Sequence, residues 1–208
     1  MHFSAQGGGN ANPVRVSARC PHCNKEAVLD QLGQDIGFNN GIICGQRRCP
    51  NLQCMKHIFV ITQNGNLVAA YPPVRIDFNP DSIPVGVLKT FEEALTCQSN
   101  GALIAAAIMV RRTLEEICAE RQAKGGNLKA RLKDLQSKIV LPQELLDAMD
   151  ELRLLGNDAA HIEAKEFSEI SEEGLLVAIE FTKEILKGIY QYAALLGRLR
   201  ALKPKQQP

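Results

Sequence analysis

Two close pairs of cysteines constrain the fold of this chain more than any other feature. Cys20 and Cys23 lie in CPHC, and Cys49 and Cys54 lie in CPNLQC, with residues 24–48 between the two pairs. Two such pairs joined by a β excursion can present four sulfurs tetrahedrally to Zn²⁺. Because a closed four-sulfur site leaves no position for water, we expect the zinc ion to be a structural cofactor.

Other interpretations of the cysteines stay open. Cys44 lies near the second pair and can replace Cys49 as a ligand. The thiols can also pack as small hydrophobic side chains, although the proline in each pair favours metal binding. A redox role for Cys20 and Cys23 is disfavoured, because no βαβ pattern of the thioredoxin type accompanies them.

The residues around the cysteines predict a small β domain, a zinc ribbon over residues 18–71. Its β-type runs are GIIC, HIFVIT and LVAAY, and the Asn-Gly pair in QNGN predicts a hairpin turn between the last two. Residues 1–17 are rich in glycine and polar residues, which predicts a flexible tail. Arg47 and Arg48 can contact a phosphate, but a solvated surface position is favoured for both.

A change of composition separates this domain from a helical half. Residues 72–84 contain four prolines, which predicts a connector, because proline breaks helices. Residues 85–200 show helical spacing and predict a bundle, followed by a tail over residues 201–208. Helices are expected near residues 84–97, 101–123, 127–138, 142–162 and 171–200. The expected fold class is therefore α+β, a small N-terminal β zinc ribbon followed by an all-α bundle.

The charge balance and the hydropathy pattern limit the classes of partner. The chain has 24 Lys and Arg against 23 Asp and Glu, so its formal net charge of +1 creates no global field that attracts nucleic acid or an anionic membrane. The N-terminus lacks a secretory signal pattern, and the run ALIAAAIMV is too short to cross a bilayer. We therefore expect a cytoplasmic protein without a membrane partner.

One helical segment places charges among apolar residues. Arg111 and Glu115 fall on the same helical face as Ile104, Ile108 and Cys118. The spacing of four residues allows an ion pair within one helix. Because a charge among isoleucines is costly unless it is paired, this face predicts a buried Arg-Glu pair in a polar network or an interface.

A second polar stripe consists of Arg153, Asn157 and His161, which advance by four residues each. A histidine beside an asparagine can be held in one tautomer and act as a general acid or base near neutral pH. An arginine on the same stripe can carry a phosphate, and Gly156 lets another backbone approach closely. Cross-linking of helices is nevertheless the commoner role for such a pair, and the stripe alone favours it.

Four stretches of the helical half, EALTCQSNGALIAAAIMVRRTLEEIC, GGNLKARLKDL, LRLLGNDAAH and IYQYAALL, resemble a bacterial domain family of unknown function within the HEPN superfamily. The resemblance covers roughly residues 70–198. HEPN domains are small helical bundles that usually dimerise, and active members are metal-independent ribonucleases. The resemblance therefore implies a homodimer formed through the bundle, an RNA partner, and a role in bacterial defence against phage or plasmids.

The HEPN motif is an arginine, four to six residues, then a histidine at the dimer interface. The resemblance implies that His161 is the acid/base and Asn157 its orienter. The arginine departs from the pattern, because Gly156 stands five residues before His161 and seven residues separate Arg153 from it. Arg153 or Arg111 can supply the phosphate contact; without one, the site would bind RNA while barely cutting it. The rival hypothesis is a non-enzymatic dimerisation module whose ribbon binds a protein or nucleic acid.

Overall fold

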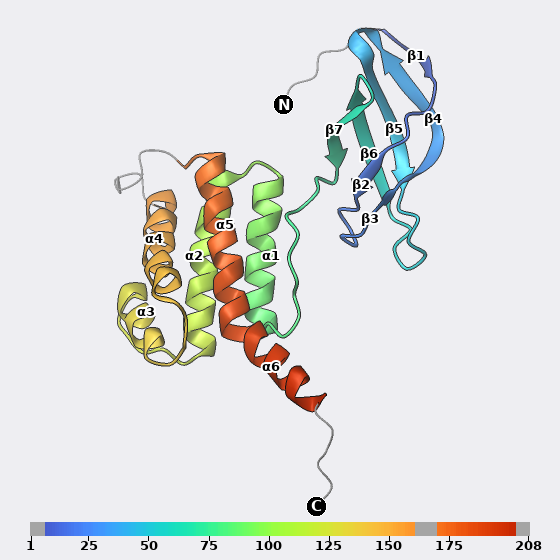
Figure 1. Cartoon of the computed structure of the whole chain (residues 1–208). Coiled ribbons are helices and arrows are strands. Elements are labelled where there is room, and N and C mark those ends of the chain that lie inside the picture. The colour runs from blue at the N-terminus through green and yellow to red at the C-terminus, as the bar shows by residue number, and fades with distance from the viewer. Residues whose placement is uncertain (1–6, 161–169, 203–208) are drawn as a thin grey trace, which may run out of the picture. The chain divides into compact units, whose positions relative to one another are not determined.

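The computed structural model describes residues 7–160 and 170–202 of the chain (Figure 1). The chain divides into two compact units, Met1–Asp77 and Phe78–Pro208. The N-terminal unit consists of antiparallel strands and the C-terminal unit of helices. The α+β order expected from the sequence is confirmed.

The N-terminal unit is built on a five-stranded antiparallel sheet with the order β1-β4-β5-β6-β7, accompanied by the ribbon β2-β3. Asn64 and Gly65 form the turn between the last two strands, and both have positive φ angles, 50° and 84°, as the Asn-Gly pair predicts. The bounds are β1 Gly8–Ala11, β2 Ser17–Arg19, β3 Glu26–Val28, β4 Asp30–Phe38, β5 Ile42–Arg48, β6 His57–Gln63 and β7 Asn66–Tyr71.

In the segment expected to be a tail, residues 1–17, the described part from residue 7 onward contributes to both sheets. Gly8–Ala11 forms β1 along the edge of β4, and Ser17 begins β2. Edge pairing needs only main-chain hydrogen bonds, so the exposed sequence GGNA forms a strand without any hydrophobic alternation. This is why composition alone predicted a tail here.

A buried ion pair joins β4 to β5. Arg47 and Asp35 are 1% and 0% exposed, and two hydrogen bonds of 2.6 and 2.7 Å link the guanidinium to the carboxylate. Arg47 also donates to the carbonyl oxygen of Val14 at 2.9 Å. The solvated position expected for Arg47 is therefore wrong, because Asp35 neutralises it inside the unit. A Cβ at Gly45 would overlap the Asp35 carboxylate, so glycine provides the space for the pair.

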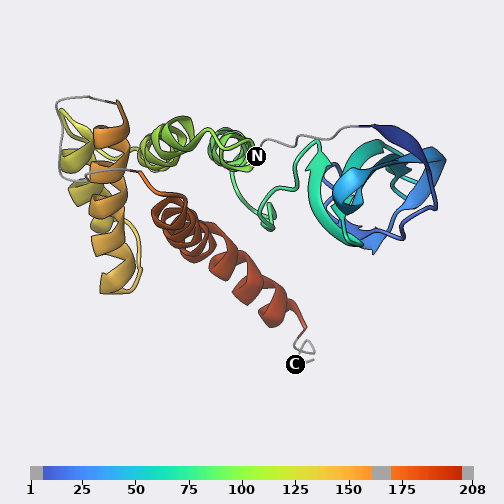
Figure 2. The same cartoon turned by 90° about the horizontal axis from the view of Figure 1, so that it is seen from above.

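The C-terminal unit consists of six α-helices in the described residues. Figures 1 and 2 show α2 at the centre of the unit, packed against α1, α4 and α5. Its buried face includes Val110, Leu114 and Ile117. Ser171 caps α5 by accepting a hydrogen bond from the Gly174 amide. The bounds are α1 Val85–Ser99, α2 Leu103–Glu120, α3 Leu128–Gln136, α4 Gln143–Ala160, α5 Glu172–Leu186 and α6 Tyr192–Ala201.

The helix expected over residues 171–200 is divided by a π-helical turn, Lys187–Gln191. Arg121 from the end of α2 donates to the Ile189 carbonyl oxygen at 3.3 Å, and its guanidinium lies 4.8 Å from the centre of the Tyr190 ring. A widened turn of this kind depends on such tertiary partners, and hydrophobic periodicity does not reveal it. Beyond the turn, α6 has no buried residue.

Residues 72–84, all of which the structure describes, contain no helix or strand. The connector nevertheless packs against the helical unit at its end, where Phe78 meets Phe91 of α1 edge to face with 4.7 Å between ring centres. Across residues 7–160 and 170–202, no helix is both long enough and apolar enough to span a membrane.

Candidate metal centre and polar helix crossing

The four paired cysteines come together in the N-terminal unit. Cys20 and Cys23 follow β2, while Cys49 and Cys54 lie between β5 and β6. All four sulfurs lie within 4.8 Å of one another. The Cys20 and Cys54 sulfurs are 3.8 Å apart, and those of Cys23 and Cys49 are 3.7 Å apart. This cluster of four thiols is compatible with a metal site.

Each cysteine pair is shaped by a tight turn. The Asn24 amide donates to the Cys20 carbonyl oxygen at 2.9 Å, and the Cys54 amide donates to the Asn51 carbonyl oxygen at 2.8 Å. Asn51 also donates from its side chain to the Cys23 sulfur at 3.6 Å. Hydrogen bonds of this kind favour a charged sulfur, the form that binds metals.

The thiols differ in how easily they lose a proton. The main-chain amide of Lys25 lowers the pKa of Cys23 to about 6. Burial raises the pKa of Cys20 and raises the pKa of Cys49 to about 12. Four adjacent thiolates are favourable only when a cation compensates for their charge and burial. The chemistry of the donor set therefore fits a divalent metal ion.

Cys44 lies outside the cluster that the described residues form. It stands on β5 opposite Ile36 and Ile61. Cys20 and Cys49, by contrast, are fully buried and belong to the hydrophobic core of the unit. Of the two candidates for the second pair, Cys49 is the residue that the fold brings to the cluster. The other buried residues of this core are Val16, Leu29, Ile58 and Val60.

A polar contact joins α2 to α4 in the C-terminal unit. The Nη1 atom of Arg111 donates to Asn157 Oδ1 at 3.0 Å, and its Nε atom donates to Glu115 Oε1 at 3.4 Å. Arg111 and Glu115 are 26% and 29% exposed. The pair expected to be buried is thus half-buried, and Ile104 and Ile108 of the same face are exposed. Cys118 of this face is fully buried, so only the N-terminal part of the face lies at the surface of the helical unit.

Gly156 makes the crossing of α2 and α4 possible. It is buried, and an added Cβ would overlap the Cβ of Arg111 and lie 3.0 Å from the carbonyl oxygen of Ala107. The glycine therefore lets the two helices approach closely at the point where Arg111 reaches Asn157.

Arg153 forms an ion pair within α4. Its Nε atom donates to Asp150 Oδ1 at 2.7 Å, and its side chain is 15% exposed. The hydrogen bond from Arg153 lowers the pKa of Asp150. Asp150 was not among the residues predicted for the site, although its spacing of three residues from Arg153 indicates such a pair. His161, the fourth residue predicted for this site, lies outside the described residues.

Comparison with known proteins gives a family for the helical unit. The model of the family described as a domain of unknown function, DUF4145, matches residues 92–205, which is more than half of the chain. The matched range contains Arg111, Arg153 and Asn157. No curated protein and no solved structure matches the chain.

Proposed function

The chain belongs to the DUF4145 family, and we propose that its helical unit carries a HEPN-like, RNA-directed site at the crossing of α2 and α4. In this proposal Arg111 contacts a phosphate, His161 acts as general acid and base, and Asn157 orients His161. The proposal rests on one observation, the hydrogen bond of 3.0 Å that Arg111 makes to Asn157 across the crossing.

Arg111 is suited to bind a phosphate in this position. A guanidinium has five N–H donors, and in the part of the chain that the structure describes Arg111 uses two of them, toward Glu115 and Asn157. Its side chain is 26% exposed, so it is accessible to a ligand yet partly shielded from water. Partial desolvation strengthens a charge-assisted hydrogen bond to a phosphate oxygen.

The pairing of Arg153 supports Arg111 as the phosphate contact. Arg153 is bound to Asp150 at 2.7 Å, and turning it toward a ligand would leave that carboxylate without this partner. Arg111 instead touches Asn157, one helical turn before His161. The motif arginine that the sequence of α4 lacks would thus be supplied by α2.

The chemistry expected of this set is metal-independent cleavage of RNA. His161 would take the proton of a ribose 2′-hydroxyl, whose oxygen attacks the adjacent phosphorus, and would return a proton to the leaving 5′-oxygen. Arg111 would stabilise the charge that develops on the phosphate, a contribution of about 10²- to 10³-fold in rate. If this rate enhancement is lost, the site still binds RNA.

We propose zinc as the metal of the cysteine cluster. Four sulfurs placed tetrahedrally about 2.3 Å from a zinc ion lie about 3.8 Å apart. The separations of 3.7 and 3.8 Å between two pairs of sulfurs agree with this value. Because the cluster supplies four thiols and includes core residues, the zinc ion would be structural and would hold the N-terminal unit folded.

The RNA proposal is tested with the full chain in buffer without added divalent metal ions. Binding and cleavage of single-stranded and structured RNA are compared among wild type, Arg111→Gln, His161→Ala and Arg153→Gln. We expect Arg111→Gln to weaken activity by about 10² and His161→Ala to abolish cleavage. Arg112→Gln is the matched control, because Arg112 is the next residue, is 57% exposed and pairs with Glu116; its effect should stay below about fivefold.

Two results would contradict the RNA proposal. Wild-type protein that neither binds nor cuts any of these RNAs excludes it. Equal losses in Arg111→Gln and Arg112→Gln, with both variants folded by circular dichroism, would show that charge alone matters and that the crossing of α2 and α4 is not the site.

A non-enzymatic interaction module remains the second candidate function. Exposed apolar side chains along α6 and at its C-cap support it, since they share one face of the helix and contiguous apolar surface marks interaction sites. They include Leu195, Leu199 and Leu202. In this alternative the helical unit binds a protein, and the contact of Arg111 with Asn157 serves packing.

A further inference from the structure

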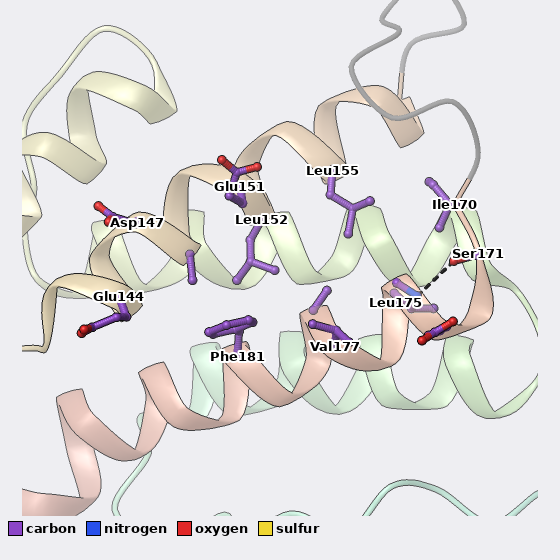
Figure 3. Close-up of a pocket in the computed structure, with 14 residues that line it drawn as sticks. Glu144, Asp147, Glu151, Leu152, Leu155, Ile170, Ser171, Leu175, Val177 and Phe181 are labelled. Carbon is purple, nitrogen blue, oxygen red and sulfur yellow. Dashed lines mark hydrogen bonds between the residues drawn. The ribbon is translucent and has the colours of Figure 1, made fainter.

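A groove of about 670 Å³ runs between α4 and α5 (Figure 3). Leu152, Leu155 and Leu175 form its buried floor. Val177 and Phe181 line it as well, and they are 52% and 39% exposed. Figure 3 shows these side chains of α4 and α5 facing one another across the groove. Exposed apolar side chains beside such a groove mark a surface that binds another apolar group.

The rim of the groove is acidic. Glu144, Asp147 and Glu151 follow one another along α4, and Glu173 lies in the first turn of α5. All four are exposed. The described residues that line the groove include no Lys, Arg or His. A segment that binds here therefore gains from apolar side chains in its centre and positive charges on its flanks.

The helix α6 has the complementary character. Residues 185–208 contain five Lys and Arg and no Asp or Glu. At 100° per residue, the large apolar side chains of α6 and its C-cap cover an arc of about 120°, and Arg198 and Arg200 flank this arc on opposite sides. These apolar side chains are all exposed: Tyr192, Leu195, Leu196, Leu199 and Leu202.

We propose that α6 of a second copy of this chain binds in the groove between α4 and α5, its leucines on the apolar floor and its arginines against the acidic rim. The lengths agree. The groove follows α4 from Glu144 to Leu155, about 16 Å, and the apolar stripe from Tyr192 to Leu202 is about 15 Å long.

The α6 helix of the same chain cannot occupy this groove. On α5 the groove ends at Phe181, and residues 182–191 continue as helix for about 16 Å before α6 begins. Figures 1 and 2 show α6 running on from α5, away from α4. Each chain offers one α6 and one groove, so two copies related by a two-fold axis exchange their helices and form a closed dimer. This dimer does not depend on the RNA site.

The test uses two charge-reversal variants of the full chain. The groove variant is Asp147→Lys with Glu151→Lys, and the helix variant is Arg198→Glu with Arg200→Glu. All four positions are exposed, so the fold should be unaffected. We expect the wild type to be a dimer by light scattering and sedimentation. Each variant alone should dimerise at least about tenfold more weakly, because like charges then face each other.

Mixing the two variants provides the decisive measurement. An equimolar mixture should restore a dimer with one copy of each variant. In that dimer the basic α6 of the groove variant meets the acidic groove of the helix variant, and the acidic α6 of the helix variant meets the basic groove. Lys89→Glu with Lys133→Glu is the control, since it makes the same change in net charge as the helix variant at exposed positions of α1 and α3 and should leave the dimer intact.

Three outcomes would overturn the proposal. The first is a wild type that stays monomeric up to about 100 μM. The second is a groove variant that dimerises as well as the wild type, which would indicate pairing of α6 with α6 or another interface. The third is a mixture that does not restore the dimer when each variant alone is monomeric.

Discussion

Arg111 on α2 donates a hydrogen bond of 3.0 Å to Asn157 on α4, next to Gly156, where the two helices are too close for an added Cβ. The residues are 46 positions apart in the sequence. Gly156 is therefore part of the helix crossing, and its missing side chain leaves room for the Cβ of Arg111 on the neighbouring helix. It also brings a cation from α2 to the polar stripe of α4.

Replacing Gly156 by alanine should destabilise the helical unit. The new methyl group would overlap the Cβ of Arg111, and overpacking of this kind costs about 1–3 kcal/mol, which exceeds the gain of up to about 1 kcal/mol in helix propensity. Gly197→Ala on α6 is the control, because an added Cβ there meets no atom within 4 Å. Urea unfolding should show a lower free energy of unfolding for Gly156→Ala alone. Equal stabilities of the two variants would contradict the close crossing.

Removing Asp35 should unfold or strongly weaken the N-terminal unit. Asp35→Ala leaves the buried Arg47 without its carboxylate, and such uncompensated charges cost about 3–5 kcal/mol. Asp30→Ala is a matched control, because Asp30 and Arg48 also link β4 to β5 but are 44% and 37% exposed; its cost should not exceed about 1 kcal/mol. Amide hydrogen exchange of β4 and β5 measures both effects. The idea fails if the two variants exchange alike.

Removal of the metal should unfold the N-terminal unit and leave the helical unit folded. We expect about one zinc ion per chain in fresh protein, and chelation should abolish the dispersed NMR signals of the sheet while the helices stay folded. Cys49→Ser should lose zinc, whereas Cys44→Ser, on the same chain segment but outside the cluster, should retain it. Zinc well below one per chain in freshly purified wild type, or equal loss in both variants, would refute the assignment.

The pair of Asp150 and Arg153 should make the stability of the helical unit depend on pH. The hydrogen bond from Arg153 lowers the folded-state pKa of Asp150. The contribution of the ion pair to the stability of the folded state is therefore complete above the unfolded pKa of Asp, about 3.9. It is lost as the pH falls through the lower folded value. Asp150→Asn should therefore be less stable than wild type at pH 7 and equally stable near pH 2.

Circular dichroism at 222 nm, which reports mainly the helices, measures this difference in denaturant titrations at each pH. Asp150 is 44% exposed, so the loss at pH 7 should stay below about 1 kcal/mol. In the Arg153→Gln background, Asp150→Asn should lower the stability at pH 7 by less than it does in the wild type, because the two substitutions remove the same ion pair. A difference between wild type and Asp150→Asn that is as large at pH 2 as at pH 7 would exclude the ion pair as its origin.

Much of the fold could be predicted because its signals are local. The Asn-Gly pair at residues 64 and 65 specifies a turn through its own backbone preferences, and Ser171 caps a helix through the Gly174 amide, only three residues away. The prolines of residues 72–84 disfavour the interior of a helix there. Even the cysteine cluster has a local signal, since each pair lies within a single turn.

Tertiary structure decided what depends on residues far apart in the chain. Nothing near Arg47 indicates that Asp35 will neutralise it in the interior, and the strand Gly8–Ala11 exists only because the edge of β4 offers hydrogen bonds. Only the crossing of α2 and α4 brings Arg111 next to Asn157. The sequence by itself thus determined the order of the two units, most of the helices, the Asn-Gly hairpin and the paired cysteines, because these follow from backbone preferences and short spacings. Packing alone decided which charges are buried and which arginine meets the asparagine, because those contacts form between elements that no local preference brings together.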